Sequence, residues 1–176
     1  MDPQKSNNKT VILEVKEPPK KKEIIKKEKQ KRQITRTTRW HFSESDLKQE
    51  NQYTILYDLS HTPFIHQQIK NKLSSYRSQD IEKNLYEPTK MAYLQGVLQK
   101  METCQLKCFY CRESVILLYE NVREPKQWTL ERIDNKIGHT MDNVEIACLS
   151  CNLRRRTMYH ERYVLTKNIQ NIVKTG

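Results

Sequence analysis

The stretch WTLERIDNKIGHTMDNVEIACLSCN, residues 128–152, decides the fold that the sequence predicts. It overlaps QWTLERID (127–134), whose alternating apolar residues indicate a β-strand. The next segment, NKIGHTMDN (135–143), has the Asn, Gly and Asp that are typical of a loop. A second strand, VEIAC (144–148), is followed by LSCNLRRRTMYH (149–160), which has the character of a helix. The order strand, strand, helix predicts a ββα unit.

Two matched cysteine pairs surround this unit. Cys108-x-x-Cys111 and Cys148-x-x-Cys151 are separated by 36 residues. Zinc prefers four soft ligands in a tetrahedron, and one tight Cys-x-x-Cys turn supplies two of them. We therefore expect one closed, structural Zn²⁺ site, whose binding adds folding free energy to a small core. We expect Cys104 to lie outside the site, because the other four cysteines already form two equivalent pairs.

Positive charge is concentrated at the beginning of the chain. Residues 1–39 carry thirteen Lys and Arg against five Asp and Glu, so 13 − 5 gives +8 of the chain's net charge of +11. The segment has no aromatic residue and too little apolar surface to offset the entropy of ordering, so we expect a disordered basic arm. Such an arm attracts phosphate backbones or anionic surfaces. A solubilising tail and a nuclear-import signal are the alternatives.

The chain has no apolar run of the roughly 18 residues that a membrane span requires, and no secretory signal at its beginning. We expect a soluble protein of a reducing compartment, with no membrane partner. In such a compartment paired cysteines bind metal more often than they form disulfides.

Helices are predicted between the arm and the cysteines. Thr62 before Pro63 is typical of a helix start, and apolar residues then recur at helical spacing. We expect a second, shorter helix over 78–85, a third opened by Pro88, a strand over 115–119 and a last helix over 163–172. The predicted class is α+β, divided into a basic arm (1–39), a helical region (40–102) and a zinc-bound ββα module with a C-terminal helix (103–176).

The segment LERIDNKIGHTMDNVEIACLSCNLRR (130–155), together with CFYC (108–111), resembles the HNH endonuclease family. In that family two Cys-x-x-Cys pairs hold a ββα-metal (His-Me finger) site. The resemblance covers about residues 104–160, and its local pattern is similar to HNH-like proteins of phages and large DNA viruses.

The resemblance assigns roles to individual residues. It implies that Glu131 and Asn152 supply oxygen ligands to a catalytic Mg²⁺ or Mn²⁺, and that Asn143 takes the central asparagine position. Arg132 falls where the family has its general-base histidine. A guanidinium stays protonated, so Arg132 cannot abstract a proton from water, although it could grip the scissile phosphate.

Another group must then activate the attacking water. His139 and Asp134 are the two candidates, since one has a suitable ordinary pKa and the other is the nearest extra carboxylate. Their structural alternatives are a surface histidine and an aspartate that caps the loop. Arg154, Arg155 and Arg156 follow the last cysteine and are expected to contact phosphates, the alternative being a solvated run of charge.

Two functions compete on these residues. The first, which the oxygen ligands favour and which we expect, is a divalent-metal-dependent endonuclease that hydrolyses phosphodiester bonds in DNA. The second, which Arg132 favours, is a zinc-stabilised DNA-binding or virion protein that has kept the fold and lost hydrolysis. Both place the protein on nucleic acid, in the cytoplasm or nucleus of an infected host or in a virion. Positive charge does not distinguish DNA from RNA, so an RNA-binding zinc protein is a third alternative. The sequence does not determine the substrate form, the sequence preference or the oligomeric state.

Overall fold

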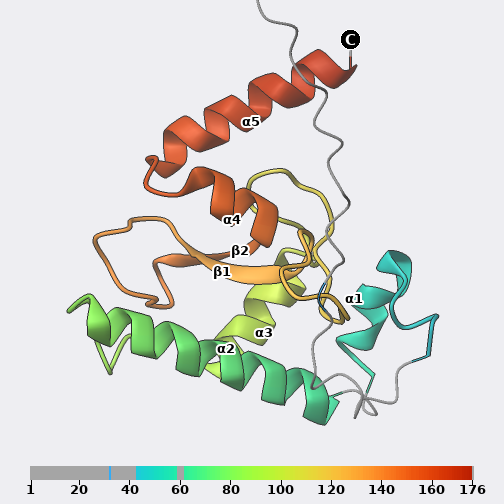
Figure 1. Ribbon diagram of the computed structural model, residues 1–176, viewed down its shortest axis with the longest axis horizontal. Coiled ribbons are helices and arrows are strands. Elements are labelled where there is room, and N and C mark those ends of the chain that lie inside the picture. Colours follow the sequence, from blue (N-terminus) through green and yellow to red (C-terminus); the bar gives the residue numbers. More distant parts are fainter. Residues whose placement is uncertain (1–31, 33–42, 59–61, 176) are drawn as a thin grey trace, which may run out of the picture. The chain divides into compact units, whose positions relative to one another are not determined.

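The computed structural model describes Arg32, residues 43–58 and residues 62–175, with side chains described as far as residue 170 (Figure 1). The predicted basic arm over 1–39 lies outside the described residues except for Arg32. The elements, in chain order, are a short 3-10 helix (Gln49–Asn51), α1 (Gln52–Ile55), α2 (Thr62–Glu82), α3 (Leu94–Thr103), β1 (Trp128–Arg132), β2 (Val144–Cys148), α4 (Leu149–Arg155) and α5 (His160–Thr175). The predicted α+β class is confirmed.

The two strands form an antiparallel hairpin whose register pairs Trp128 with Cys148 and Arg132 with Val144. β2 has the predicted bounds, whereas β1 ends at Arg132, two residues earlier than expected. Nearly every residue of the hairpin is buried, because helices and loops cover both of its faces. α4 follows β2 without a connecting residue, so the predicted ββα order is observed.

One continuous helix, α2, replaces the two helices that were predicted over 62–85. It begins at Thr62 as expected, but it continues through Ser78 to Glu82. Asn84 has a φ of 57°, and the N–H of Leu85 donates to the Asp80 carbonyl at 2.8 Å. This 6→1 bond after a residue in the left-handed region is a Schellman cap. The helix therefore ends at a cap rather than at an internal break near Ser78.

The third predicted helix begins later than expected. Pro88 does not open α3, which starts at Leu94, because the preceding backbone pairs with the loop between the strands. The N–H of Ala92 donates to the His139 carbonyl at 2.8 Å, and the N–H of Met141 donates to the Lys90 carbonyl at 3.0 Å. This pairing holds the inter-strand loop against the start of α3.

The strand predicted over 115–119 does not form. Ile116 makes an isolated bridge to Gln127. The backbone groups of Leu117 and Leu118 bind buried glutamine side chains of α1 and α2 instead. Oε1 of Gln52 accepts from the N–H groups of Leu117 and Leu118 at 2.8 and 2.9 Å, and Nε2 of Gln68 donates to the Leu117 carbonyl at 2.9 Å. Two side-chain amides thus satisfy the groups that a partner strand would otherwise have satisfied.

A single core joins these elements. It contains Trp128, Leu130 and Ile146 of the hairpin, Ile69 of α2 and Met101 of α3, each with at most 1% of its surface exposed. None of the helices in the described residues combines the length and apolar character that crossing a bilayer requires.

Candidate functional site

Four cysteines converge at the junction of the hairpin and α4. The Sγ atoms of Cys108, Cys111, Cys148 and Cys151 all lie within 4.8 Å of one another. Cys148 caps the N-terminus of α4 and Cys151 lies in its first turn, while Cys108 and Cys111 belong to a separate turn. The convergence predicted from the spacing is confirmed, and the cluster could hold a metal ion such as zinc.

Backbone donors orient the sulfurs of the cluster. The N–H of Cys148 donates to Sγ of Cys108 and the N–H of Cys151 donates to Sγ of Cys148, both at 3.3 Å. The N–H of Arg112 donates to the Cys108 carbonyl at 3.0 Å and so closes the turn over residues 108–112, in which Arg112 has a φ of 60°. The neighbouring thiols lower the pKa of Cys108 and raise the pKa of Cys148, so the four thiols share their protons unevenly. All of them must lose their protons to bind a metal ion as thiolates.

Cys104 lies outside this cluster, as expected from the pairing of the other cysteines. Its Sγ is 3.5 Å from the Met101 carbonyl at the end of α3, and burial raises its pKa. A neutral thiol bound to a carbonyl has a packing role there.

Two tyrosines near the cluster were not assigned a part in it from the sequence. The rings of Tyr110 and Tyr163 meet edge to face, with centroids 4.8 Å apart. Both hydroxyl oxygens are buried, and neither has a hydrogen-bond partner among the described residues. The Tyr163 hydroxyl nevertheless approaches the Cys151 thiol closely enough for a weak hydrogen-bonding contact, which raises the pKa of Tyr163 after the larger effect of burial. Buried donors without partners, beside thiols, require an explanation.

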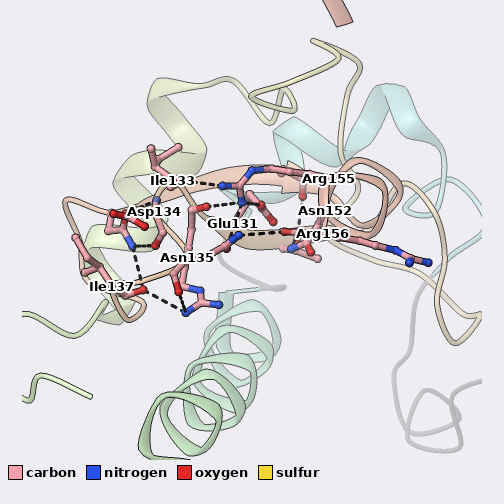
Figure 2. A network of polar contacts seen from close by, with 12 residues as sticks. Glu131, Ile133, Asp134, Asn135, Ile137, Asn152, Arg155 and Arg156 are labelled. Atoms are coloured by element: carbon pink, nitrogen blue, oxygen red, sulfur yellow. Dashed lines mark hydrogen bonds and ion pairs between the residues drawn. The ribbon is translucent and has the colours of Figure 1, made fainter. Parts of the chain in front are cut away.

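Glu131, the predicted acidic ligand, forms a buried ion pair. Its Oε1 accepts from Nη1 of Arg155, and the two side chains are 5% and 1% exposed. Arg155 also donates to the carbonyls of Arg132 at 2.8 Å and Ile133 at 2.6 Å (Figure 2). Burial raises the pKa of Glu131, and Arg155 only partly offsets this effect. The guanidinium thus occupies Oε1, one of the two carboxylate oxygens of Glu131 that a cation could bind.

Asn152, the other predicted oxygen ligand, binds β1. Its Nδ2 donates to Oγ1 of Thr129 at 3.2 Å, and that hydroxyl donates to the Ala147 carbonyl at 2.9 Å. No group of three or more His, Cys, Asp or Glu ligand atoms forms around Glu131 in the part of the chain that the structure describes.

Arg132 contacts the loop that follows β1. Its Nη1 donates to the carbonyls of Asn135 at 3.3 Å and Ile137 at 3.2 Å. These carbonyls lie at the turn of the loop, so the guanidinium stabilises the turn conformation.

The central asparagine organises the same loop. Nδ2 of Asn143 donates to the carbonyls of Asp134, Ile137 and Gly138, and its Oδ1 accepts from the N–H of Asp134 at 2.9 Å. Oδ1 of Asp134 accepts from the N–H of Lys136 at 2.8 Å, which is the loop-capping alternative foreseen for this carboxylate.

His139 is buried against α2 rather than exposed at the surface. Its Nδ1 is 2.8 Å from Oδ1 of Asp80, and its backbone N–H donates to Oδ2 of the same carboxylate at 2.6 Å. The imidazole stacks on Tyr76 with ring centroids 4.4 Å apart. Burial lowers the pKa of His139, although Asp80 acts in the opposite direction. Asp80, which the sequence did not single out, connects the loop to α2.

The three successive arginines have different environments. Arg155 is buried, whereas Arg154 and Arg156 are exposed. In Figure 2 the Arg156 side chain extends away from the polar network. Its backbone carbonyl accepts from Nδ2 of Asn135 at 3.1 Å. Two of the three predicted phosphate contacts therefore face solvent, and the third stabilises the fold.

Comparisons of the chain with protein-family models, with curated proteins and with solved structures found no match in any of the three. What the protein does must therefore be inferred from its own side chains and their contacts.

Proposed function

We propose that residues 103–176 form a zinc-stabilised module of the ββα-metal kind that binds nucleic acid, in the first instance DNA, and does not hydrolyse it. The observation that carries this proposal is the buried ion pair between Glu131 and Arg155. This ion pair favours a zinc-stabilised DNA-binding protein over a divalent-metal-dependent endonuclease, the two functions considered from the sequence.

Zinc is the metal that suits the cysteine cluster. Four thiolates satisfy all of its tetrahedral valences, which leaves no open position for water or substrate. Cys108, Cys111, Cys148 and Cys151 would hold the ion and so join the turn at 108–111 to the start of α4. Its contribution is structural, because a closed Cys₄ site has no position for catalysis.

The contacts around Glu131 argue against hydrolysis. A hard divalent cation would need the Glu131 carboxylate, and at Oε1 it would have to displace Arg155 from a buried pair. Leaving one member of a buried ion pair without its partner typically costs about 3–5 kcal/mol. The Asn152 amide is held through its nitrogen, which donates to Thr129. A metal at Oε1 of Glu131 would therefore compete with a contact that stabilises the fold.

The groups that could activate a water molecule are also engaged elsewhere. Arg132 is permanently charged and donates to loop carbonyls. The Asp134 carboxylate caps the loop, and His139 is buried with Asp80. Each side chain assigned to proton transfer thus has a structural contact that accounts for its position.

Charge supports a nucleic-acid partner. The chain has a net charge of +11, and the exposed Arg154 and Arg156 follow directly on the metal cluster. Lys136 is exposed in the adjoining loop. Exposed basic side chains beside a rigid hairpin and helix suit contacts to successive phosphates.

The test combines binding and nicking by the full chain loaded with zinc. We expect affinity for DNA that falls steeply with salt and that weakens in the double variant Arg154→Ala/Arg156→Ala. The matched control is Lys70→Ala/Lys83→Ala, which removes the same charge from exposed positions of α2 and its cap. We expect no plasmid nicking with Mg²⁺ or Mn²⁺ beyond that of Glu131→Ala.

A divalent-metal-dependent endonuclease is the second candidate, because Glu131 and Asn152 come from the contacting elements β1 and α4. Nicking by the native chain that disappears in both Glu131→Ala and Asn152→Ala would establish this candidate and overturn the proposal. Binding that is equal in the two double variants would argue against the arginine surface.

A further inference from the structure

A cavity of about 280 Å³ opens between the loop after β1 and the connection from α4 to α5. Residues 133–136 form one wall, and Arg155 with residues 157–161 forms the other. None of the roles assigned above uses this space. Its lining residues Arg155 and Thr157 are the sequence neighbours of the exposed Arg154 and Arg156, which are proposed to contact nucleic acid.

Direct hydrogen bonds connect the two walls. Nδ2 of Asn135 donates to the Arg156 carbonyl at 3.1 Å, and Nη2 of Arg155 donates to the Ile133 carbonyl at 2.6 Å. A cavity whose walls are joined in this way is formed before a ligand arrives, which reduces the entropy lost on binding. Nε of Arg155 is buried and has no hydrogen-bond partner among the described residues.

The chemistry of the walls suits a flat ring with polar edges. Tyr159 is 75% exposed and offers its ring for stacking, and Ile133 and Met158 add apolar surface. Asp134 brings a carboxylate to the same space, whereas the Asn135 amide is already bound to Arg155 and to the Arg156 carbonyl. Carboxylate groups can hydrogen-bond the edges of bases, and aromatic rings stack on their faces.

The balance of charge favours a neutral group inside the cavity. The lining carries two cationic side chains, Lys136 and Arg155, and two carboxylates, Asp134 and Glu161. Arg155 is already paired with Glu131, so among the described lining residues a phosphate inside the cavity would meet two carboxylates and one free cation. Arg154 and Arg156 are exposed outside the cavity.

We propose that this cavity accepts one unpaired nucleobase of a single-stranded nucleic acid, stacked on Tyr159, while Arg154 and Arg156 contact the neighbouring phosphates. This inference rests on the proposed nucleic-acid-binding function. In a duplex the bases are paired and stacked within the helix, so their faces cannot reach Tyr159. The protein therefore prefers single strands to duplexes of the same sequence.

Fluorescence anisotropy with the zinc-loaded full chain tests the preference. The probes are a labelled single-stranded DNA, the single-stranded RNA of the same sequence and the corresponding DNA duplex, all at one salt concentration. We expect Tyr159→Ala to weaken single-strand binding by at least about fivefold, since stacking on an aromatic side chain contributes roughly 1–3 kcal/mol per base. Tyr159→Phe keeps the ring and should retain the affinity.

The matched control is Tyr93→Ala, which removes another exposed tyrosine, 58% exposed and located before α3. It should change neither single-strand nor duplex binding, and circular dichroism and zinc content should show that both alanine variants are folded. A similar effect on the DNA and RNA probes means that the base alone is recognised, and a larger effect on one of them means that the sugar is recognised as well.

Two outcomes separate the inference from the function on which it rests. Equal affinity for single strands and duplex, unaffected by Tyr159→Ala but weakened by Arg154→Ala/Arg156→Ala, overturns the base pocket and leaves nucleic-acid binding standing. Absence of binding to all three probes overturns both.

Discussion

Arg155 near the end of α4 donates a hydrogen bond to the carboxylate of Glu131 in β1, and both side chains are almost fully buried. The same guanidinium contacts the backbone at the end of β1, so one side chain joins the helix to the strand and to the loop beyond it (Figure 2). A protein cation thus neutralises the carboxylate for which a metal ion was predicted from the sequence.

Removing Arg155 should destabilise the fold strongly. Arg155→Met leaves the Glu131 carboxylate buried without a partner, so we expect the free energy of unfolding to fall by about 3–5 kcal/mol. Urea denaturation at saturating zinc measures the change. The control Arg154→Met alters the neighbouring exposed arginine and should cost no more than about 0.5 kcal/mol. If the two substitutions lowered the free energy of unfolding equally, the buried ion pair would not contribute more to stability than an exposed arginine does.

The double variant Arg155→Met/Glu131→Met should recover most of the stability lost in Arg155→Met. Two apolar side chains can replace a buried ion pair of similar volume with little loss, because no charge is then left without a partner. A double variant that is no more stable than Arg155→Met alone would contradict this expectation.

Metal removal should separate the four clustered cysteines from the fifth. We expect a strong chelator or Cys108→Ser to abolish zinc binding and to lower the unfolding temperature sharply, because the metal contributes folding free energy. Cys104→Ser should retain about one zinc per chain and nearly the native unfolding temperature. Elemental analysis and thermal unfolding measure both quantities, and loss of zinc from Cys104→Ser would place this residue in the site.

Tyr163→Phe should weaken zinc binding while leaving the fold intact. The buried hydroxyl has no partner among the described residues and lies near Cys151, so it can donate to the thiolate once a metal is bound. Loss of a group that hydrogen-bonds a ligand typically lowers metal affinity by about 10- to 100-fold.

Competition with a chromophoric chelator measures this affinity, and the cobalt-substituted protein should show a shifted sulfur-to-metal absorption band. Tyr159→Phe is the matched control and should change neither quantity. An unchanged zinc affinity in Tyr163→Phe would mean that the hydroxyl only fills space.

The burial of His139 should make stability depend on pH, because it outweighs the opposite effect of Asp80 on the pKa of the imidazole. Burial lowers the folded-state pKa of His139 below its ordinary value of 6.5, and Arg132 and Lys83 act in the same direction. The unfolded chain therefore binds the proton more readily, so the contribution of this group to stability is present above about pH 6.5 and is lost as the pH falls through the folded-state pKa.

Urea midpoints at pH 7.5 and 5.5, with zinc saturating at both, measure this effect. His139→Gln has no titrating ring, so its midpoint should fall less between the two pH values than that of the native chain. If the urea midpoints of the native chain and of His139→Gln fell by the same amount, the pH dependence would come from the cysteines or from other groups.

Elements with a clear local signal were well predicted from the sequence. The bounds of β2 and the start of α2 agree with the structure, because a buried strand and a Thr-Pro helix start are encoded by adjacent residues. The prediction of a strand over 115–119 was wrong. The backbone of Leu117 binds the side chains of Gln52 and Gln68, which are far away in the chain. The apolar and β-branched residues of this segment indicate that it is buried. Whether it forms a strand depends on whether another strand lies beside it to pair with its backbone.

The cysteine spacing by itself determined where the four thiols meet, because each Cys-x-x-Cys turn presents two sulfurs in one direction. Only the tertiary structure decided the roles of Glu131, Arg155 and His139. Their partners lie 24 residues away for the Glu131–Arg155 pair and 59 residues away for His139 and Asp80. A buried charge must find a partner wherever packing brings one, and that choice depends on how α2, β1 and α4 meet rather than on any local pattern.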